Sequence, residues 1–317
     1  MPTLSDHTRL LNLLITLAYK TPDLPFPLFN LGYSLEHIGP RIVFSEAKLT
    51  LNPDLAFKSD ARNEVLLVEA KSGGIDNKQA AKYKALAPDD ISRRNLTSLP
   101  AENLKVEVCY VCLFQNRLEV LANEGKYYWG FPIIFFDGKS LRKDASSGKF
   151  RDERLEGLFS TGVTIEREPP NTYYPFGQGD SQLWISFCVL SQLMEMYAIG
   201  KREVTEDGVI KACHPLLGYC FKDERNFVKQ ITHTALESIS KSGSLRYTIK
   251  SLGGQKWQLV KMTLGKNSES FIAKFSEEFD KKPDIRKIED LTKWIVEDER
   301  KEEEKDRGKK DEKTKLS

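Results

Sequence analysis

The chain has 317 residues, 40% of them apolar and 30% charged, which is enough for two domains of ordinary size with their own hydrophobic cores. Five cysteines without the spacing of a disulfide framework favour a reducing compartment, and no segment has the unbroken apolar length of a membrane span, so we expect a cytoplasmic protein without membrane contact. The formal net charge of +2 neither supports nor excludes nucleic-acid binding, because opposite charges are segregated along the chain.

The N-terminal half predicts an α/β (α+β) domain over 1–168, with a mixed sheet flanked by helices. Apolar spacing and turn residues predict, in chain order, a helix at 5–19, strands at 41–48, 54–58 and 65–71, a helix at 75–87, and strands at 106–113 and 131–136. The strand at 65–71 is expected to be buried because it begins with the run Val-Leu-Leu-Val.

The C-terminal half has a different pattern. Residues 169–180 contain turn-forming Pro and Gly and predict a linker. Helices are expected at 183–199, 204–212 and 224–241, followed by a hairpin that turns at Gly253-Gly254. Three helices and a basic hairpin resemble a winged-helix domain, here expected over 181–283. Residues 284–317 are expected to form a charged helix or tail, partly disordered, because from Glu297 onward nine acids and eight bases leave almost nothing apolar.

Basic residues gather in the segment 222–266, which carries nine Lys or Arg and three acids and therefore a net charge of +6. This bias favours DNA, with 224–241 as the recognition helix and the hairpin as the wing. The residues expected to contact phosphates are Lys229, Lys241, Arg246, Lys250 and Lys256. Winged helices also mediate protein contacts, so a partner protein bound through this domain or the tail is the alternative.

The candidate catalytic residues lie in the first domain. Asp54 follows Pro53 at the start of one predicted strand, and Glu69 and Lys71 lie late in the next. A hairpin between these strands would bring both carboxylates to the same end of the sheet, and side-chain alternation would place Glu69 and Lys71 on one face. Two carboxylates suit a hard divalent cation of the kind that assists phosphodiester hydrolysis.

The helix that follows carries Gln79 and Tyr83, which are four residues apart and share a helix face. Together these elements resemble the PD-(D/E)XK nuclease superfamily, and the Q-x-x-x-Y pair resembles its RecB-like branch. The resemblance covers about residues 30 to 137. It implies a restriction-endonuclease-like fold, Mg²⁺ as the cofactor with Mn²⁺ able to substitute, and metal ligation by Asp54, Glu69 and the carbonyl of Ala70. It further implies that Lys71 activates water, and that Gln79 and Tyr83 place the substrate phosphate or the lysine.

An additional acid is also expected from this resemblance. The sequence Gly32-Tyr33-Ser34-Leu35-Glu36 matches a G-x-x-x-E element of that branch, which makes Glu36 a candidate catalytic residue. Glu46 competes for the same role, and the sequence does not decide between them.

These features predict a metal-dependent DNA endonuclease, and the family resemblance implies that it leaves 5′-phosphate and 3′-hydroxyl ends. Roles in defence, recombination or mobile-element processing are all compatible with this prediction. Double-strand cutting by a single active site would suggest a homodimer. One alternative is an exonuclease or single-strand nuclease, because of the Q-x-x-x-Y element. Another is a catalytically inactive DNA-binding or adaptor protein that retains only the nuclease fold.

Overall fold

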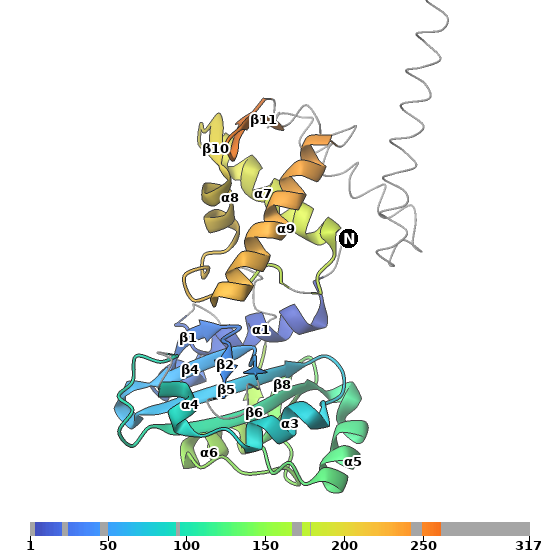
Figure 1. The fold of residues 1–317 in the computed structure, drawn as a ribbon. Helices are drawn as coiled ribbons and strands as arrows, with labels where there is room; N and C mark the ends of the chain where they lie inside the picture. Colours follow the sequence, from blue (N-terminus) through green and yellow to red (C-terminus); the bar gives the residue numbers. More distant parts are fainter. Residues whose placement is uncertain are drawn as a thin grey trace, which may run out of the picture. The chain divides into compact units, whose positions relative to one another are not determined.

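A computed structural model describes residues 4–20, 25–44, 50–92, 96–166, 173–177, 179–241 and 249–260. The chain divides into two compact units. The first comprises Asp6–Pro175 together with Pro215–Asn226, and the second comprises the described residues before Asp6, Phe176–His214 and the described residues from 227 onward (Figure 1). Residues 215–226, which the sequence places in the C-terminal domain, therefore cluster with the first unit. Glu46, Arg246 and the charged tail lie outside the described residues, as do parts of the expected linker.

The first unit is built on a mixed sheet. Among the described residues, seven strands form it in the order β1-β4-β5-β6-β7-β8-β9. Their bounds are β1 Ser34–Ile38, β4 Leu55–Ser59, β5 Glu64–Lys71, β6 Lys105–Leu113, β7 Ile133–Phe136, β8 Ser140–Lys143 and β9 Val163–Thr164, with a separate short pair β2 Ile42–Val43 and β3 Thr50–Leu51. Strands β5, β6 and β7 run parallel, and the other neighbours are antiparallel. The expected mixed sheet is confirmed.

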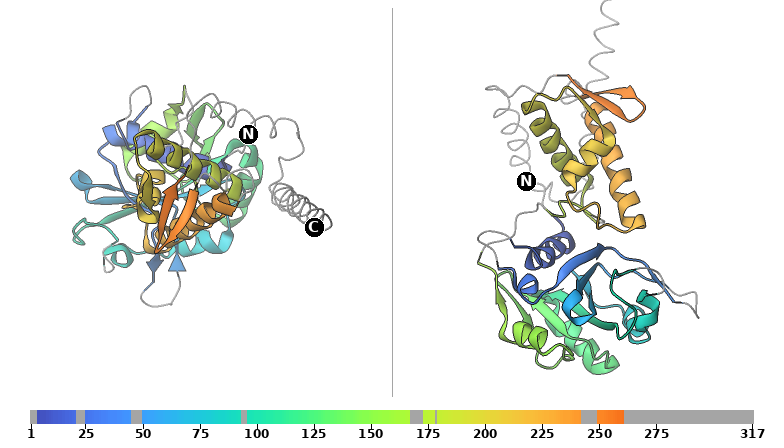
Figure 2. Two further views of the ribbon diagram at one scale, coloured as in Figure 1. Left: turned by 90° about the horizontal axis from the view of Figure 1, so that it is seen from above. Right: turned by 90° about the vertical axis from the view of Figure 1, so that its left-hand side faces the viewer.

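Helices cover both faces of this sheet, which explains why β5 is buried along nearly its whole length. Val65 and Leu67 pack into a core that also contains Ala80, Ile91 and Val120 from three helices. The opposite face of β5 packs against the first helix, which is buried on most of its sides (Figure 2). The helices of this unit are α1 Asp6–Leu17, α2 Pro27–Asn30, α3 Asn77–Lys84, α4 Pro88–Ser92, α5 Arg117–Tyr127 and α6 Glu153–Thr161, with short 3₁₀ turns at Asp60–Arg62 and Phe114–Asn116.

The second unit combines helices with a small sheet. Its elements are α7 Gln182–Ala198, β10 Glu203–Thr205, α8 Glu206–Cys213, α9 Lys222–Lys241, β11 Ile249–Gly253 and β12 Lys256–Leu259, where the first turn of α9 belongs to the other unit. The three strands pair in the order β10-β12-β11. The β11–β12 turn has positive φ at Gly254 and Gln255, as a tight two-residue hairpin turn requires. No described helix is both long and apolar enough to cross a membrane.

The sequence misplaced the start of one helix and missed strand β1. The helix expected at 204–212 begins only at Glu206, because Val204 pairs with Trp257 in β10 and Thr205 caps α8 by accepting a hydrogen bond from Gly208 N. Strand β1 was not predicted at all, since Ser34–Ile38 has an irregular burial pattern with a bulge between Leu35 and His37. Within the expected strand 41–48, the described part forms only the two-residue β2.

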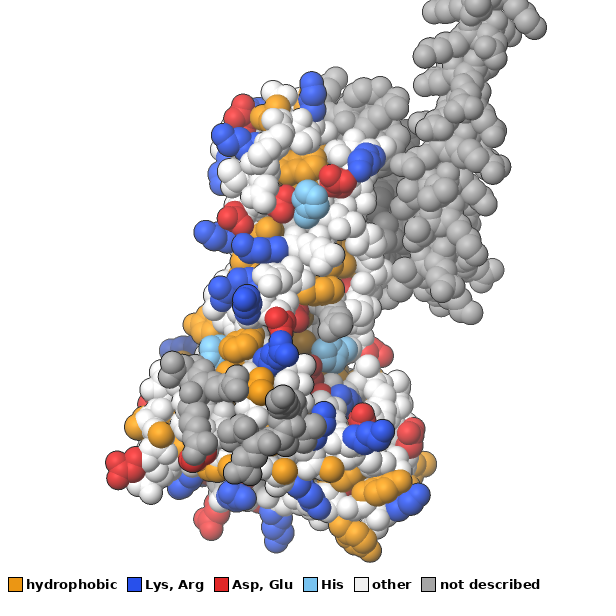
Figure 3. Space-filling model, viewed as in Figure 1, with side chains coloured by type: hydrophobic (Ala, Val, Ile, Leu, Met, Phe, Trp, Pro, Cys, Tyr) orange, Lys and Arg blue, Asp and Glu red, His pale blue; other side chains and the backbone are white. Residues whose placement is uncertain are grey.

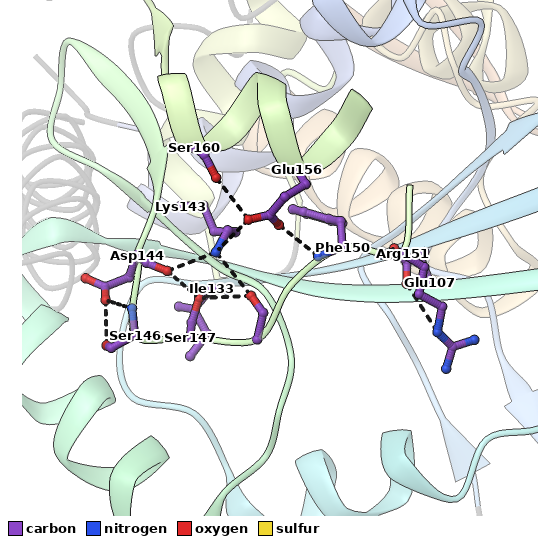
Figure 4. Close-up of polar contacts among 11 residues, drawn as sticks. Glu107, Ile133, Lys143, Asp144, Ser146, Ser147, Phe150, Arg151, Glu156 and Ser160 are labelled. Atoms are coloured by element: carbon purple, nitrogen blue, oxygen red, sulfur yellow. Dashed lines mark hydrogen bonds and ion pairs between the residues drawn. The ribbon is translucent and has the colours of Figure 1, made fainter. Parts of the chain in front are cut away.

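A buried lysine fixes the loop between β8 and α6 (Figure 4). The Lys143 side chain is 3% exposed, and its Nζ lies 3.2 Å from the carbonyl oxygens of Asp144 and Gly148 and from Oε1 of Glu156. These three acceptors match the three N–H donors of an ammonium group. Glu156 in turn accepts hydrogen bonds from Phe150 N and Ser160 Oγ, so the buried charge is fully compensated.

A buried acid of the same unit, Glu107, predicts that stability depends on pH. Burial raises the pKa of Glu107 to about 7; the charges of Glu64 and Glu156 add to this shift and Arg151 opposes it. Because the folded pKa exceeds the unfolded value of 4.5, the contribution of Glu107 to stability is complete below that value and is lost as the pH rises through 7. We expect Glu107→Gln to raise the free energy of unfolding at pH 8, by up to about 3 kcal/mol, and to change it little at pH 5.

Urea unfolding of both proteins at the two pH values measures this difference. Glu102 is exposed, so Glu102→Gln is the matched control and should change the free energy of unfolding by the same small amount at both pH values. An equal effect of Glu107→Gln at pH 5 and pH 8 would contradict the assignment of the raised pKa to Glu107.

Candidate active site

Asp54 and Glu69 lie side by side where strand β4 begins and its antiparallel neighbour β5 ends. Leu55 pairs with Val68, so Asp54, one residue before β4, lies beside Glu69. The Asp54 backbone N–H donates to Val68 O at 3.1 Å, and the Asp54 side chain accepts a hydrogen bond from Ala70 N at Oδ2, at 2.7 Å. The ladder that aligns the two strands thus also holds the Asp54 carboxylate against β5.

Lys71 contacts Glu69 directly. Its Nζ lies 2.6 Å from Glu69 Oε1, as expected for side chains two residues apart on one strand face. Glu69 is 3% exposed, and Lys71 is less buried. Ala70 between them is fully buried, and its N–H is the group that binds Asp54. Asp54, Glu69 and Lys71 are therefore brought together.

Gln79 and Tyr83 on α3 both donate hydrogen bonds to the carboxylate of Glu69. Gln79 Nε2 lies 2.7 Å from Oε1, and Tyr83 Oη lies 2.6 Å from Oε2. Asp76 caps α3 by accepting from Lys78 N, which fixes the helix that presents them. The resemblance implied that this pair places the phosphate or the lysine, whereas in the structure both side chains orient Glu69. Tyr83 is also a core residue, with its ring edge-on to a neighbouring tyrosine.

The charge of this cluster is incompletely compensated. Burial raises the pKa of Glu69, and the negative charge of Asp54 raises it further, against the opposing effects of Lys71 and Tyr83. Burial and the Glu69 charge raise the pKa of Tyr83 well above its ordinary value, so Tyr83 remains a hydrogen-bond donor. A cation beside both carboxylates would relieve the remaining repulsion.

His7 belongs to the site and was missed in the sequence. It lies at the start of α1, and its Nε2 is 3.1 Å from Asp54 Oδ1. Burial lowers the pKa of His7, but the hydrogen bond and charge of Asp54, with the charge of Glu69, outweigh it and raise the pKa above 6.5. No motif marks this histidine, because only the packing of α1 against β5 brings it to Asp54.

The structure places Glu36 in a different set of contacts. Its Oε1 accepts a hydrogen bond from Ser98 N at 2.7 Å, and its Oε2 lies 3.2 Å from Lys58 Nζ. Lys58 is four residues along β4 from Asp54, toward the other end of the strand. Glu36 is therefore not brought together with Asp54 and Glu69, and Glu46 lies outside the described residues.

The donors of the site fit a hard divalent cation. Within the described parts of the chain, no group of three or more His, Cys, Asp or Glu could hold a metal ion. The set is instead two carboxylates, from Asp54 and Glu69, with the carbonyl of Ala70 as an expected third ligand. Mg²⁺ is often held by one or two carboxylates, with water and substrate phosphate completing its shell. The unrelieved charge on Glu69 is consistent with such a role.

In the second unit, the basic residues singled out in the sequence are partly neutralised. Lys229 Nζ lies 3.4 Å from Asp207, and Lys241 Nζ lies 2.7 Å from Glu237 one helical turn earlier. Lys250 and Lys256 are exposed on β11 and β12. Figure 3 shows Lys and Arg interspersed with Asp and Glu on the face viewed, without a continuous basic patch.

Comparison with known proteins identifies a family. No solved structure matches the chain. An uncharacterized protein of Methanocaldococcus jannaschii, MJECL32, is 34% identical over 92 residues, which cover 26% of this chain and 21% of that protein. The chain thus spans about a fifth of the length of this curated relative. The family model of the MJECL32 domain matches residues 6–174, more than half of the chain, and this range contains all seven strands of the sheet that carries the candidate site. The chain therefore belongs to the MJECL32 domain family.

Proposed function

We propose that the chain is a metal-dependent DNA endonuclease of the PD-(D/E)XK type that hydrolyses phosphodiester bonds to 5′-phosphate and 3′-hydroxyl ends. One observation carries the proposal. Asp54, Glu69 and Lys71 lie together at adjoining strand ends, with the Gln79 and Tyr83 side chains both bonded to Glu69. Burial and the charge of Asp54 make an ionised Glu69 costly to the fold even with three donors bound to it, which is typical of a site kept for its chemistry.

The residues would divide the reaction as follows. Asp54, Glu69 and the Ala70 carbonyl would hold Mg²⁺, which supplies a polarised water and charge neutralisation at phosphorus. Gln79 and Tyr83 keep the Glu69 carboxylate in one orientation, so its geometry is set before substrate arrives. The Lys71 ammonium would orient the attacking water, or deprotonate it as its amine, and stabilise negative charge on the phosphate.

The second unit would position DNA. A helix, a short strand, two helices and a hairpin follow one another, and the short strand joins the hairpin in one sheet. This order supports a winged-helix module, with α9 as its recognition helix and exposed Lys250 and Lys256 on its wing. The ion pairs of Lys229 and Lys241 reduce the electrostatic contribution expected from those two residues.

A second candidate is an exonuclease or single-strand nuclease of the RecB-like branch. The observation that favours it is the engagement of the whole Q-x-x-x-Y element with Glu69. Circular DNA separates the two functions, because an endonuclease cuts a closed circle and an exonuclease needs an end.

The proposal predicts metal-dependent cleavage that requires Lys71. Supercoiled circular and linear DNA are incubated with the protein and Mg²⁺, Mn²⁺ or a chelator, and products are followed on gels. Lys71→Ala is expected to lower the cleavage rate by about 10²-fold to 10³-fold. Lys105→Ala is the matched control, because this exposed lysine starts β6 at the opposite end of the sheet. Lack of cleavage by the folded wild type with every divalent ion would refute both nuclease functions and favour a non-catalytic DNA-binding protein.

A further inference from the structure

A segment from the C-terminal half of the chain completes the unit that carries the candidate site. Residues 219–221 run along the end of β1: Ile38 N donates to Tyr219 O and Phe221 N donates to Ile38 O, each at 2.9 Å. Cys220 forms a parallel bridge with Ile38, and Phe221 packs against the core of the first unit. This segment lies beyond residue 174, where the family match ends.

These contacts fix the start of α9 and place Glu224 over Gly39. A Cβ built on Gly39 would lie 3.2 Å from Glu224 Cβ, 3.5 Å from Cγ and 3.6 Å from Oε2. Gly39 N in turn donates to the carbonyl oxygen of Asp54 at 2.8 Å. Glu224 therefore packs against Gly39, whose N–H holds the backbone carbonyl of Asp54, a candidate metal ligand.

The carboxylate of Glu224 is held from a second side by Tyr174. The Tyr174 hydroxyl donates to Glu224 Oε1. The Tyr174 backbone is itself fixed, because its N–H donates to Asn12 Oδ1 at 2.9 Å and its carbonyl accepts from Asn12 Nδ2. Asn12 lies on α1, the helix that also presents His7.

Glu224 is electrostatically part of the same cluster as Asp54. Burial raises the pKa of Glu224, the Tyr174 hydrogen bond lowers it, the charge of Asp54 raises it and His7 lowers it, with a net upward shift. A simpler role would be that of an acid in the first turn of a helix, which stabilises the positive end of the helix dipole. Asp223 in the same turn already fills that role while exposed and paired with Arg41. Glu224 is turned inward instead.

We infer that Glu224 is a positioning residue of the candidate cation site. The Glu224 side chain supports Asp54 through Gly39, and its carboxylate adds negative charge beside Asp54. This inference rests on the proposed function. Glu224 acts around the ligands and is not counted among them, because the described residues contain no group of three such side chains that could hold a metal ion. Outer groups of this kind tune the affinity of a metal site.

Mn²⁺ binding to the full chain without DNA tests the inference. The free Mn²⁺ signal in electron paramagnetic resonance gives the dissociation constant for the wild type, Glu224→Gln and Asp223→Asn. Glu224→Gln is expected to weaken binding about tenfold, as removal of an outer-shell partner does. Asp223→Asn, one residue away and exposed, should leave the affinity unchanged. Thermal unfolding without metal should differ little between wild type and Glu224→Gln, because Gln still accepts from Tyr174.

The outcomes separate this inference from the proposed function. Wild-type affinity in Glu224→Gln, with Mn²⁺ binding lost in Asp54→Asn, overturns the role of Glu224 and leaves the nuclease proposal standing. A wild type that neither binds Mn²⁺ nor cuts DNA overturns both. If Glu224→Gln does not fold, Tyr174→Phe decides the question, because it removes the hydroxyl that holds Glu224: weaker binding supports the inference and unchanged binding refutes it.

Discussion

Glu69→Gln is expected to abolish metal-dependent cleavage, with a loss on the order of 10³-fold or more, while the protein stays folded. The amide keeps the shape of the carboxylate and still accepts from Lys71 Nζ and Gln79 Nε2. It removes the negative charge that would bind the cation. Because burial and the charge of Asp54 raise the pKa of Glu69, the folded chain is destabilised by the ionised form.

The same change should therefore leave the melting temperature at pH 8 equal to or above that of the wild type. Rates on circular DNA with Mg²⁺ and melting curves by circular dichroism measure the two effects. Glu153→Gln, an exposed acid at the start of α6, is the control and should keep full activity. Cleavage by Glu69→Gln at a rate close to wild type would remove Glu69 from the reaction. Lost activity with a large drop in melting temperature would show a structural role instead.

The arrangement around Glu69 was accessible from the sequence because it depends on short-range geometry. Strand alternation predicts that Glu69 and Lys71 share a face, and a tight connection between two strands predicts that Asp54 lies beside them. Helix periodicity similarly places Gln79 and Tyr83 on one side of α3. The sequence could not assign their hydrogen bonds to Glu69, since these depend on how α3 packs on the sheet.

The residues that sequence reasoning missed come from distant segments. His7 contacts Asp54 although the two are 47 positions apart in the sequence. Glu224 belongs to the same unit although it follows α7 and α8 in the sequence. Neither lies in a motif, and only tertiary packing brings them to β4. Glu36 shows the converse: a motif match placed it in the site, whereas Lys58 and Ser98 hold it elsewhere.

Charge counts along the sequence were similarly incomplete. The segment 222–266 is strongly basic by itself, but acids from the segment before it fold back onto its helix. Asp207 pairs with Lys229, and Glu206 Oε2 lies 2.8 Å from His233 Nδ1. Net charge in a window therefore overstates the field at the surface, because the fold decides which charges face one another.

Gly148→Ala is expected to destabilise the first unit by about 3 kcal/mol or more. A Cβ at this position would overlap the carbonyl group of Gly130 and lie 2.8 Å from the carbonyl carbon of Phe131. Both obstacles are backbone, so relief requires moving one chain segment. That movement would weaken the hydrogen bond from Gly148 N to Phe131 O at 3.0 Å and pull the Gly148 carbonyl from the buried Lys143 ammonium.

Gly157→Ala is the matched control, because the same methyl group is added in the same unit with opposite consequences. Gly157 lies inside α6, and among the described residues no atom outside its own helix turn and chain neighbours lies within 4 Å of the point that a Cβ would occupy. Alanine there should stabilise the chain by about 0.5–1 kcal/mol through its higher helix propensity. Urea unfolding of the two variants should thus shift in opposite directions from the wild type. If Gly148→Ala unfolds at the wild-type urea concentration, the close approach of its loop to Gly130 is not a feature of the folded chain.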